Sequence, residues 1–484
     1  MMRKYLLVGA SAFILGAGSM AFVNQAAHAT ASAKPETYHM LELFGDVLTT
    51  VDNQYVTPVD DKKLIQSAID GMLTSLDPHS NYLNPEDYKD MRDQTRGEYG
   101  GLGLEVTSED GVVKVIAPMD DTPAARAGVK SGDYITAIDG QSVLGLPLDQ
   151  AVKQMRGDVG QVITLTISRE KQDPFDVKLT REVIAVKSVK SHMEGDYGYL
   201  RISSFNEKTG EETVDAVKSL ETKDPHMKGM VLDLRDNPGG LLDQAVAVSD
   251  VFLDGGEVVS QRGRDAQDIE RYNAKAGDLT HGLPIVVLIN AGTASAAEIV
   301  SGALQDRHRA ELVGLTSFGK GSVQSVIPLR GGEDGALKLT TARYYTPSGR
   351  SIQKTGITPD LEVARTKEQA ELIANRSFQF SEATLHNSLN ADDGKVRVAR
   401  HAPAEAPPPN FDKAGDYQLT RALDLLKAGS LKTLLLERKA PVAPVAVVAE
   451  ASPPKDIEGR KAPRDVTPPE VVDPKPHTAA PERK

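Results

Sequence analysis

The spacing of hydrophobic residues divides the chain into regions with different predicted structure. Residues 37 to about 90 carry apolar side chains at helical spacing, which predicts a small helical packing unit. From about 96 to 171, short apolar runs and glycine turns predict strands, with a short helix over 148–155. From about 172 to 365, apolar strands alternate with helices. The pattern therefore predicts one helical part, one part rich in strands and one of mixed α/β type.

The α/β region contains two strand–turn–helix units of the same kind. Their strands are almost entirely apolar, and strands of that composition are buried on both faces. A sheet covered by helices accommodates both units. The first unit runs through 230–234, 235–240 and 241–252, the second through 285–289, 290–294 and 295–304, and a further strand is expected over 337–345.

The N-terminus has the charge and hydropathy pattern of a secretory signal peptide. Arg3 and Lys4 precede an apolar stretch from 5 to 23, and Ala27-His28-Ala29 supplies a small-x-small cleavage site. We expect cleavage after Ala29 and an exported, periplasmic protein. The competing interpretation is an uncleaved inner-membrane anchor, because the stretch is near the length that spans a bilayer.

Composition narrows the class of protein. At 484 residues the chain has room for about three domains, and with no Trp and 5% aromatic residues its core must be aliphatic. The net charge of −12 argues against a nucleic-acid partner, which would need a basic face. The sequence has no Cys, which excludes disulfides, a thiol nucleophile and thiolate metal ligands. No other metal or cofactor motif is present, so neither is expected.

The C-terminal region changes composition again. Ten of the 28 prolines fall within 440–484, interleaved with charges of both signs, which predicts a disordered tail. Before it, residues 417–436 have the spacing of an amphipathic helix. We expect this helix to cap the folded body, with an adaptor-binding helix as the alternative.

Ser295 stands where the second apolar strand passes into its helix. The segment Ser295–Glu298 fits the S-x-x-E capping box, and a helix cap needs no catalysis. The same position also suits a nucleophile, because free backbone N–H groups and the positive end of the helix dipole lie beside the hydroxyl. Ser295 alone does not decide between the two functions.

Lys320, between two glycines, offers a base for Ser295. Burial disfavours the charged form of a lysine, so its pKa falls and the amine accepts a proton near neutral pH. The alternative is an ordinary lysine on an exposed loop. Gln324 can orient the neutral amine only if the glycines bend the chain, because four extended residues span about 13 Å. His308, in a charged run, is the competing base for a Ser-His-Asp triad.

The turn Asp236–Gly240 ends the first apolar strand. Its Asn-Pro-Gly-Gly sequence is good turn chemistry, and a plain turn is one interpretation. Glycine also lets a substrate approach the backbone closely. An N–H of Gly239 or Gly240 would then complete an oxyanion hole with the N–H of Ala296. The sequence does not decide which glycine serves.

At these residues the chain resembles the carboxy-terminal processing proteases, serine peptidases with a Ser-Lys-Gln catalytic set. The resemblance covers about residues 37–365 and implies Ser295 as nucleophile, Lys320 as general base and Gln324 as its orienting partner. Several motifs in the family's order make it far more specific than any single one. They are Leu232–Gly240, Gly292–Glu298, Phe318–Gln324, Leu339–Arg350 and Gly356–Asp360.

A second resemblance concerns the glycine-rich segment Gly100–Val106. It is similar to the carboxylate-binding loop of PDZ domains, with Gly101, Leu102, Gly103 and Leu104 as peptide-binding residues. Viewed alone, such a segment is usually a turn. With the strands and helix that follow, it predicts amides that hold a terminal carboxylate while the peptide adds as a strand. In the family this domain recognises substrate C-termini and can gate the catalytic site.

These observations predict a multi-domain serine endopeptidase of fold class α+β/α/β. It would bind C-terminal regions of exported proteins through the PDZ domain and cleave peptide bonds through an acyl-enzyme. A non-catalytic PDZ scaffold and an α/β ligand carrier or acyl-thioester enzyme are the alternatives. The predicted parts are a signal peptide (1–29), a helical segment (30–90), a PDZ domain (91–171), a protease core (172–365), a C-terminal helical segment (366–439) and a disordered tail (440–484).

The expected partners follow from this function. They are protein or peptide substrates with accessible C-termini, and an adaptor protein and a homo-oligomer are left open. No membrane span is expected after signal cleavage, since no second long apolar stretch occurs in the sequence.

Overall fold

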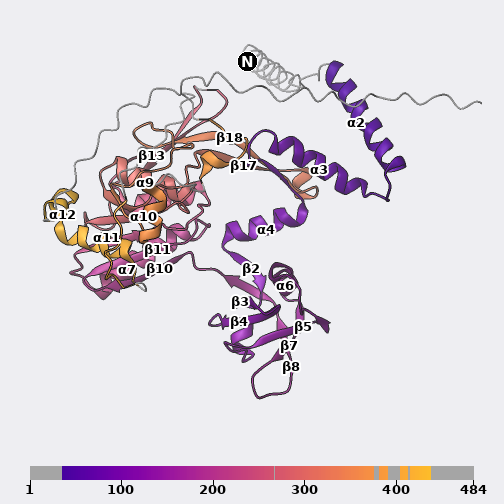
Figure 1. Ribbon diagram of the computed structural model, residues 1–484, viewed down its shortest axis with the longest axis horizontal. Helices are drawn as coiled ribbons and strands as arrows, with labels where there is room; N and C mark the ends of the chain where they lie inside the picture. The colour runs from indigo at the N-terminus through magenta and orange to yellow at the C-terminus, as the bar shows by residue number, and fades with distance from the viewer. Residues whose placement is uncertain (1–34, 266, 375–380, 391–403, 413–414, 438–484) are drawn as a thin grey trace, which may run out of the picture. The chain divides into compact units, whose positions relative to one another are not determined.

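The computed structural model describes residues 35–265, 267–374, 381–390, 404–412 and 415–437 (Figure 1). The predicted signal peptide (1–29) and proline-rich tail (440–484) lie outside these residues. No helix in the described ranges is long and apolar enough to cross a membrane.

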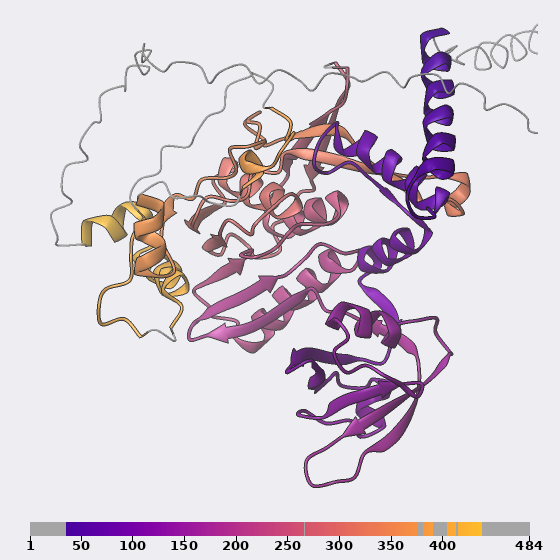
Figure 2. The same ribbon diagram turned by 45° about the vertical axis from the view of Figure 1, so that its right-hand side comes forward.

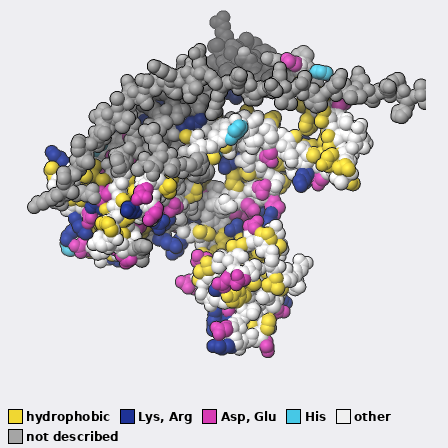
Figure 3. All heavy atoms as spheres, in the orientation of Figure 1, with side chains coloured by type: hydrophobic (Ala, Val, Ile, Leu, Met, Phe, Trp, Pro, Cys, Tyr) yellow, Lys and Arg dark blue, Asp and Glu magenta, His cyan; other side chains and the backbone are white. Residues whose placement is uncertain are grey.

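The N-terminal region is helical, as its apolar spacing predicts. The helices are α2 (Pro35–Gln54), α3 (Asp61–Thr74) and α4 (Pro85–Arg96). Asp60 and Asn84 cap α3 and α4 by accepting hydrogen bonds from backbone N–H groups of the first turn. Side chains of α2 such as Leu41 are largely exposed, and hydrophobic side chains gather on the surface of these helices in Figure 3.

A short strand, β1 (Asn81–Leu83), interrupts this helical region, and the helical spacing does not predict it. It pairs antiparallel with β18 (Ala336–Tyr345), so that Asn81 lies opposite Lys338. The partner strand lies more than 250 residues further along the chain, as the 260 positions between Ser80 and Thr340 show. The pairing brings the end of the helical region to the protease core.

The second region is a small β domain. Its six-stranded sheet has the order β3-β4-β5-β7-β8, with β6 beside β5. Its strands are β3 (Leu104–Glu109), β4 (Val112–Pro118), β5 (Tyr134–Ile138), β6 (Gln141–Ser142), β7 (Val162–Ser168) and β8 (Phe175–Thr180), its helices are α5 (Pro123–Arg126) and α6 (Leu148–Met155), and β2 (Glu98–Gly101) pairs with β9 (Glu182–Ala185) (Figure 2).

The sheet of this domain extends past the predicted PDZ boundary. β8 pairs with β7 and therefore continues the sheet past residue 171, where the PDZ domain was predicted to end. The alternation of apolar residues in Phe175–Thr180 is the pattern of a half-buried strand, which belongs with the sheet before it. A hairpin turn at Asp139-Gly140 joins β5 to β6, and both residues have positive φ.

The protease core is built on a second six-stranded sheet, of order β10-β11-β12-β15-β16-β19. From β11 to β19 the strands are parallel, and β10 is an antiparallel edge. Every residue of β12 and β15 is buried, as their apolar composition predicts. The strands are β10 (Val189–Glu194), β11 (Tyr197–Ile202), β12 (Gly229–Asp233), β15 (Ile285–Ile289), β16 (Ala310–Gly314) and β19 (Leu361–Glu362).

Helices cover both faces of this sheet, which confirms the predicted covered α/β arrangement. One hydrophobic cluster joins the sheet to α7 (Thr209–Lys223), α8 (Leu242–Phe252) and α9 (Ala296–Asp306). On the other face, α11 (Tyr417–Ala428) packs against the strands, and its position can be followed in Figures 1 and 2. Arg235 fixes the start of α11 through an ion pair with Asp416 at 2.7 Å.

The region 417–436, predicted as one capping helix, forms two separate helices. α11 ends at Gly429, whose φ of +77° suits a glycine at a helix C-terminus, and α12 (Leu431–Glu437) follows. The smaller helical elements are the 3₁₀ turn η1 (Arg330–Gly332), between β17 and β18, and, in the C-terminal part, α10 (Lys367–Ala374) and the 3₁₀ turn η2 (Glu382–Thr384).

A third sheet supplies one wall of the site described below. Most of its strands are interspersed in the sequence with those of the covered sheet. Its central strand, β18, pairs with β1, with β13 (Gly256–Arg262) and with β17 (Ser322–Pro328), and β14 (Ile269–Ala274) pairs with β13. In this sheet Gln324 of β17 lies directly opposite Thr340 of β18.

Candidate active site

Two turns meet at the carboxyl edge of the parallel sheet. β12 and β15 are neighbours, so the turns that follow them lie side by side. Thr293 Oγ1 donates to the Leu234 carbonyl at 2.8 Å, and the Ala294 N–H donates to the Asn237 carbonyl at 2.9 Å. These bonds join the Asn-Pro-Gly-Gly turn to the segment that carries Ser295.

Ser295 occupies a sharp strand-to-helix turn at the N-terminus of α9. Its backbone has φ 54° and ψ −117°, a conformation that costs a non-glycine residue on the order of 1–3 kcal/mol. The side chain is almost buried, with 7% of the residue exposed. The predicted capping box is present. A cap uses the lone pairs of a hydroxyl and leaves its proton, so capping and nucleophilic attack are compatible at this position.

Glu298 connects Ser295 to the lysine loop. Its carboxylate is fully buried and accepts four hydrogen bonds. Oε2 accepts the N–H groups of Ser295 at 2.8 Å and Lys320 at 2.9 Å, and Oε1 accepts the Gly319 N–H at 2.7 Å and the Ser317 hydroxyl at 2.5 Å. Burial raises the pKa of Glu298 to about 7, against these donors, which lower it.

The S-x-x-E motif indicates only a capping-box role for Glu298 and gives no sign of this second role. The sequence indicates burial of this carboxylate, because most of its neighbours in Ala296–Leu304 are apolar, but it does not indicate the donors. A buried carboxylate requires several donors, and here they come from the loop that carries Lys320.

Lys320 lies on a loop that glycines allow to fold back on itself. Gly319 has φ +94°, and a Cβ on Gly321 would lie 2.6 Å from the Gln353 backbone nitrogen, so no side chain fits there. The pKa of Lys320 is lowered to about 8, first by burial and then by the positive charge of Lys338. The carboxylates of Glu382, Glu298 and Asp77 act in the opposite direction.

Gln324 lies on β17, after a bulge between Val323 and itself. The chain therefore bends between Lys320 and Gln324, as their joint action requires. Gln324 Nε2 donates to Ser322 Oγ at 3.0 Å and to Thr340 Oγ1 at 3.1 Å. Within the described part of the chain, no hydrogen bond joins Ser295, Lys320 and Gln324 to one another.

A cavity of about 560 Å³ collects the predicted catalytic residues. Two further residues on its wall were not singled out from the sequence. Arg156, at the end of α6, lies over the Tyr99 ring at 4.5 Å, and Lys338 belongs to β18. The predicted site residues that line this cavity are Ser295, Lys320, Gln324, Gly239 and Gly240.

The backbone hydrogen bonds around the cavity distinguish Gly239 from Gly240 as donors to an oxyanion. The Gly239 N–H donates to Asn237 Oδ1 at 2.9 Å, whereas Gly240 and Ala296 have N–H groups without an acceptor among the described residues. Gly239 instead allows close approach, since a Cβ there would lie 2.8 Å from Ser295 Cβ. Its φ of +97° also favours glycine.

The predicted PDZ loop lines a second, smaller cavity of about 100 Å³. The carbonyls of Leu102 and Gly103 accept bonds from Ala124 and Met119, while no acceptor for the N–H groups of Leu102 and Gly103 is found among the described residues. Gly101 and Leu104 complete the loop side of the cavity, and Val152 and Met155 of α6 line its other side. The structure thus brings all four predicted loop residues to one groove.

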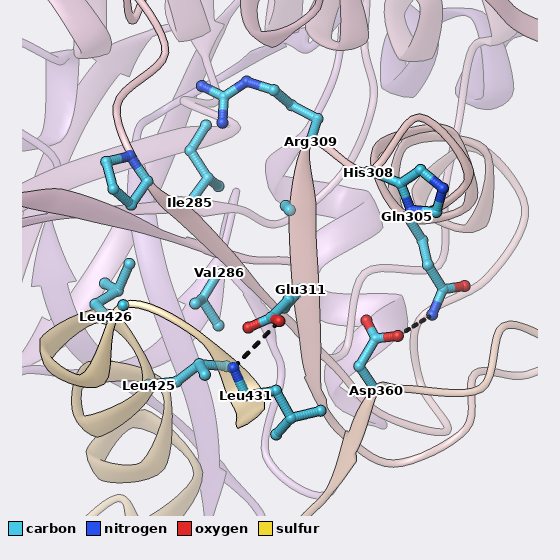
Figure 4. A pocket seen from close by; sticks show the side chains of 13 residues that line it. Ile285, Val286, Gln305, His308, Arg309, Glu311, Asp360, Leu425, Leu426 and Leu431 are labelled. Atoms are coloured by element: carbon cyan, nitrogen blue, oxygen red, sulfur yellow. Dashed lines mark hydrogen bonds between the residues drawn. The ribbon is translucent and has the colours of Figure 1, made fainter. Parts of the chain in front are cut away.

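A third hollow, of about 370 Å³, lies at the opposite edge of the covered sheet, where β15 and β16 begin (Figure 4). His308 lines it, together with Glu311 and Asp360. Neither Ser295 nor Lys320 is on its wall. A Ser-His-Asp triad that uses His308 therefore does not fit this arrangement.

Comparison with known proteins identifies the class. Family models match for peptidase family S41 over residues 196–363, for a PDZ domain over 114–169, and for the activating protease CtpB N-terminal domain over 6–87. The first two matches fall inside the predicted protease core and PDZ domain. Together they define a serine-type peptidase that carries a PDZ domain.

Two sequence relatives narrow this class. The carboxy-terminal-processing protease of Bartonella bacilliformis is 50% identical over 88% of this chain and 96% of its own length. A probable CtpA-like serine protease of Staphylococcus aureus (strain COL) is 38% identical over 67% of this chain and 65% of its own length. The solved photosystem II D1 C-terminal processing protease is 30% identical over 69% of this chain and 94% of its own, with a TM-score of 0.40.

The chain belongs to the carboxy-terminal processing proteases of peptidase family S41. It is a serine-type C-terminal processing peptidase whose PDZ domain recognises substrate C-termini. This confirms the family and the activity that the sequence motifs imply.

Proposed function

We propose that Ser295, Lys320 and Gln324 carry out peptide-bond hydrolysis through an acyl-enzyme. The observation that carries this assignment is the Glu298 carboxylate. One of its oxygens binds the backbone of both Ser295 and Lys320, which holds nucleophile and base on the wall of one cavity. The lowered pKa of Lys320, about 8, supports its role as base.

In this mechanism the neutral Lys320 amine takes the proton of the Ser295 hydroxyl as Oγ attacks the scissile carbonyl carbon. The tetrahedral oxyanion binds the N–H groups of Ala296 and Gly240, which have no acceptor among the described residues. Lys320 then returns the proton to the leaving amine nitrogen, and the C–N bond breaks. A water molecule, deprotonated by the same lysine, hydrolyses the ester and regenerates Ser295.

Substrate selection is assigned to the groove between the Gly101–Leu104 loop and α6. The N–H groups of Leu102 and Gly103 can bind the terminal carboxylate of a substrate. The apolar side chains of α6 can contact the side chain of the residue that carries this carboxylate. The N-terminal segment supports export to the periplasm, with a membrane anchor as the alternative. Exported proteins with accessible C-termini are then the natural substrates, and an adaptor can present some of them.

The direct test compares an unstructured polypeptide with a free C-terminal carboxylate and the same polypeptide with a C-terminal amide. The wild-type chain is expected to cleave the free acid with a kcat/KM higher by about tenfold, roughly the share of one charge-assisted contact. Ser295→Ala should cleave neither. Ser301→Ala, which alters a buried serine in the same helix, should cleave both like the wild type.

The experiment tests the nucleophile and the recognition of the carboxylate separately. Cleavage by Ser295→Ala at the wild-type rate would refute the nucleophile. Equal kcat/KM for acid and amide would refute carboxylate recognition by the PDZ groove and leave Ser295 in place.

The activity should depend on pH through Lys320. Only its neutral amine accepts a proton, so kcat/KM is expected to rise as the pH passes through about 8. Protonation of Glu298, with its pKa of about 7, removes an acceptor and lowers activity further in acid. Lys338→Met removes a charge that lowers the pKa of Lys320, so the midpoint of the profile should move to higher pH.

The control for this measurement is Lys218→Met, which removes an exposed charge from α7 and should leave the midpoint unchanged. kcat/KM should be measured between about pH 6 and 10, a range that includes the expected midpoint of the Lys320 titration. A midpoint that stays in place in Lys338→Met would show that Lys338 does not act on the titrating group.

A further inference from the structure

The turn after α3, residues Asp77–Ser80, contacts the catalytic wall although it belongs to the N-terminal helical region. In the sequence, Asp77-Pro78-His79 marks only a break in the helical pattern. In the structure Asp77 and Ser80 are buried, with 3% and 0% of each residue exposed. The pairing of β1 with β18 places this turn beside Thr340, which follows the paired residues of β18.

Asp77 organises the turn and reaches β18. Oδ1 accepts the N–H groups of His79 and Ser80 at 2.9 and 3.1 Å, and Oδ2 accepts the Ser80 hydroxyl at 2.6 Å. Oδ1 also accepts the Thr340 hydroxyl at 3.0 Å, across 263 positions of the chain. In return, the Thr340 N–H donates to Ser80 Oγ at 3.1 Å. The turn and the strand are therefore joined by bonds in both directions.

The direction of these bonds fixes the side chain of Gln324. An ionised carboxylate is only an acceptor, so the Thr340 hydroxyl must donate its single proton to Asp77. The Thr340 oxygen then has only lone pairs to offer Gln324, and the group that faces it must be the amide NH₂. The carbonyl oxygen of Gln324 is consequently directed away from Thr340 and is the atom left to accept a hydrogen bond from the Lys320 amine.

A second set of bonds leads from the same turn to the other side of Lys320. His79 Nε2 lies 2.8 Å from Glu382 Oε2, and Glu382 Oε1 accepts Gln353 Nε2 at 2.9 Å. Gln353 Oε1 accepts the Gly321 N–H at 2.8 Å. Both Glu382 and Gln353 are fully buried. The turn thus contacts, through side chains, the residue after Lys320 as well as Gln324.

We propose that the Asp77–Ser80 turn is a positioning element of the active site, which sets the orientation of the Gln324 amide through Thr340. The inference rests on the proposed Ser295–Lys320–Gln324 mechanism and deepens it. Asp77 and Thr340 touch neither substrate nor the reacting atoms, and they act through Gln324. An undirected Gln324 would present its NH₂ to Lys320 part of the time, and the NH₂ would then occupy the lone pair of the neutral amine that must take the Ser295 proton.

The test uses two substitutions at Thr340 that differ only in the hydroxyl. Thr340→Val keeps the shape and removes the hydroxyl, whereas Thr340→Ser keeps the hydroxyl. In the full-length protein, kcat for an unstructured polypeptide is expected to fall about tenfold to 100-fold in Thr340→Val, with KM unchanged. Thr340→Ser should retain activity close to the wild type. Thermal unfolding of each variant establishes that the comparison is made on folded protein.

A double-mutant cycle shows whether Thr340 acts through Gln324. In a Gln324→Ala background the residual activity should be the same with Thr340 and with Thr340→Val, because the orienting side chain is already absent. Asp77→Asn provides an independent variant, since an Asn NH₂ can reverse the direction of the Thr340 bond. It should lower kcat in the wild-type background and have no effect beside Gln324→Ala.

Several results would overturn the proposal. Equal kcat in Thr340→Val and Thr340→Ser, or the same fold-loss with and without Gln324, would show that the turn has only a structural role. These outcomes require an active wild type that Ser295→Ala inactivates, so they are distinct from a failure of the catalytic assignment itself.

Discussion

Lys320→Met is expected to abolish peptide cleavage while leaving the chain folded. Methionine has a similar length and no basic group, so the proton of Ser295 has no acceptor. The loss of a general base costs on the order of 10²–10⁴ in rate, and a nucleophile that depends on its base loses more. Measurement of kcat/KM for the unstructured polypeptide, with Lys218→Met as a surface control, checks this result.

The stability of the same variant gives a second, opposite signature. The pKa of Lys320 falls from 10.5 in the unfolded chain to about 8 in the folded protein. Between these values the unfolded state binds the extra proton, so the stability of the wild type rises from about pH 8 to 10.5. Below about pH 8 the cost of the buried charge is fully present. Lys320→Met lacks this cost and should unfold at a higher denaturant concentration than wild type there.

Chemical denaturation at about pH 7 and at about pH 10 measures this difference. The gap between variant and wild type should be largest at the lower pH and shrink at the higher one. Full activity in Lys320→Met would exclude this lysine as base. A wild type that is more stable than the variant at the lower pH would contradict the depressed pKa.

The second large effect is expected for Glu298→Gln. Each oxygen of the carboxylate accepts two donors, so an amide NH₂ in either orientation faces at least one backbone N–H. A buried donor left without an acceptor costs about 1–3 kcal/mol. The loop that carries Lys320 then moves away from Ser295, and kcat should fall by on the order of 100-fold.

Glu212→Gln supplies the matched control for Glu298→Gln. Glu212 also accepts backbone and hydroxyl donors, from Ser188 and Val189, but none of these three residues lines the catalytic cavity. It should lower the temperature of unfolding without lowering kcat at temperatures where the protein is folded. A Glu298→Gln variant with wild-type kcat would show that the shared carboxylate does not hold Ser295 and Lys320 in their relative positions.

Local patterns in the sequence predict the core of this fold well. β15 and α6 have the predicted bounds, because a continuous apolar run and an amphipathic turn of helix are each determined by neighbouring residues. The motifs around Ser295 and Lys320 likewise lie within short segments. The cavity collects them because both segments follow elements at the same edge of the core.

Long-range polar contacts could not be predicted in this way. Strand β1 has only three residues and exists because β18 is there to pair with it. Glu298 looked like a helix cap, because its donors at Gly319 and Lys320 are not visible from its own helix. The bond from Asp77 to Thr340 spans most of the folded chain, and nothing in the local sequence indicates its partner.

The central claim is that Ser295 is activated by Lys320, and covalent labelling tests it most directly. A serine-directed phosphonyl fluoride is added to the full-length protein at a series of pH values, and mass spectrometry locates and times the modification. The account predicts modification of Ser295, at a rate that rises as the pH passes through about 8, and no modification in Lys320→Met. Modification at another residue, or a Ser295 rate that is the same in Lys320→Met, would contradict it.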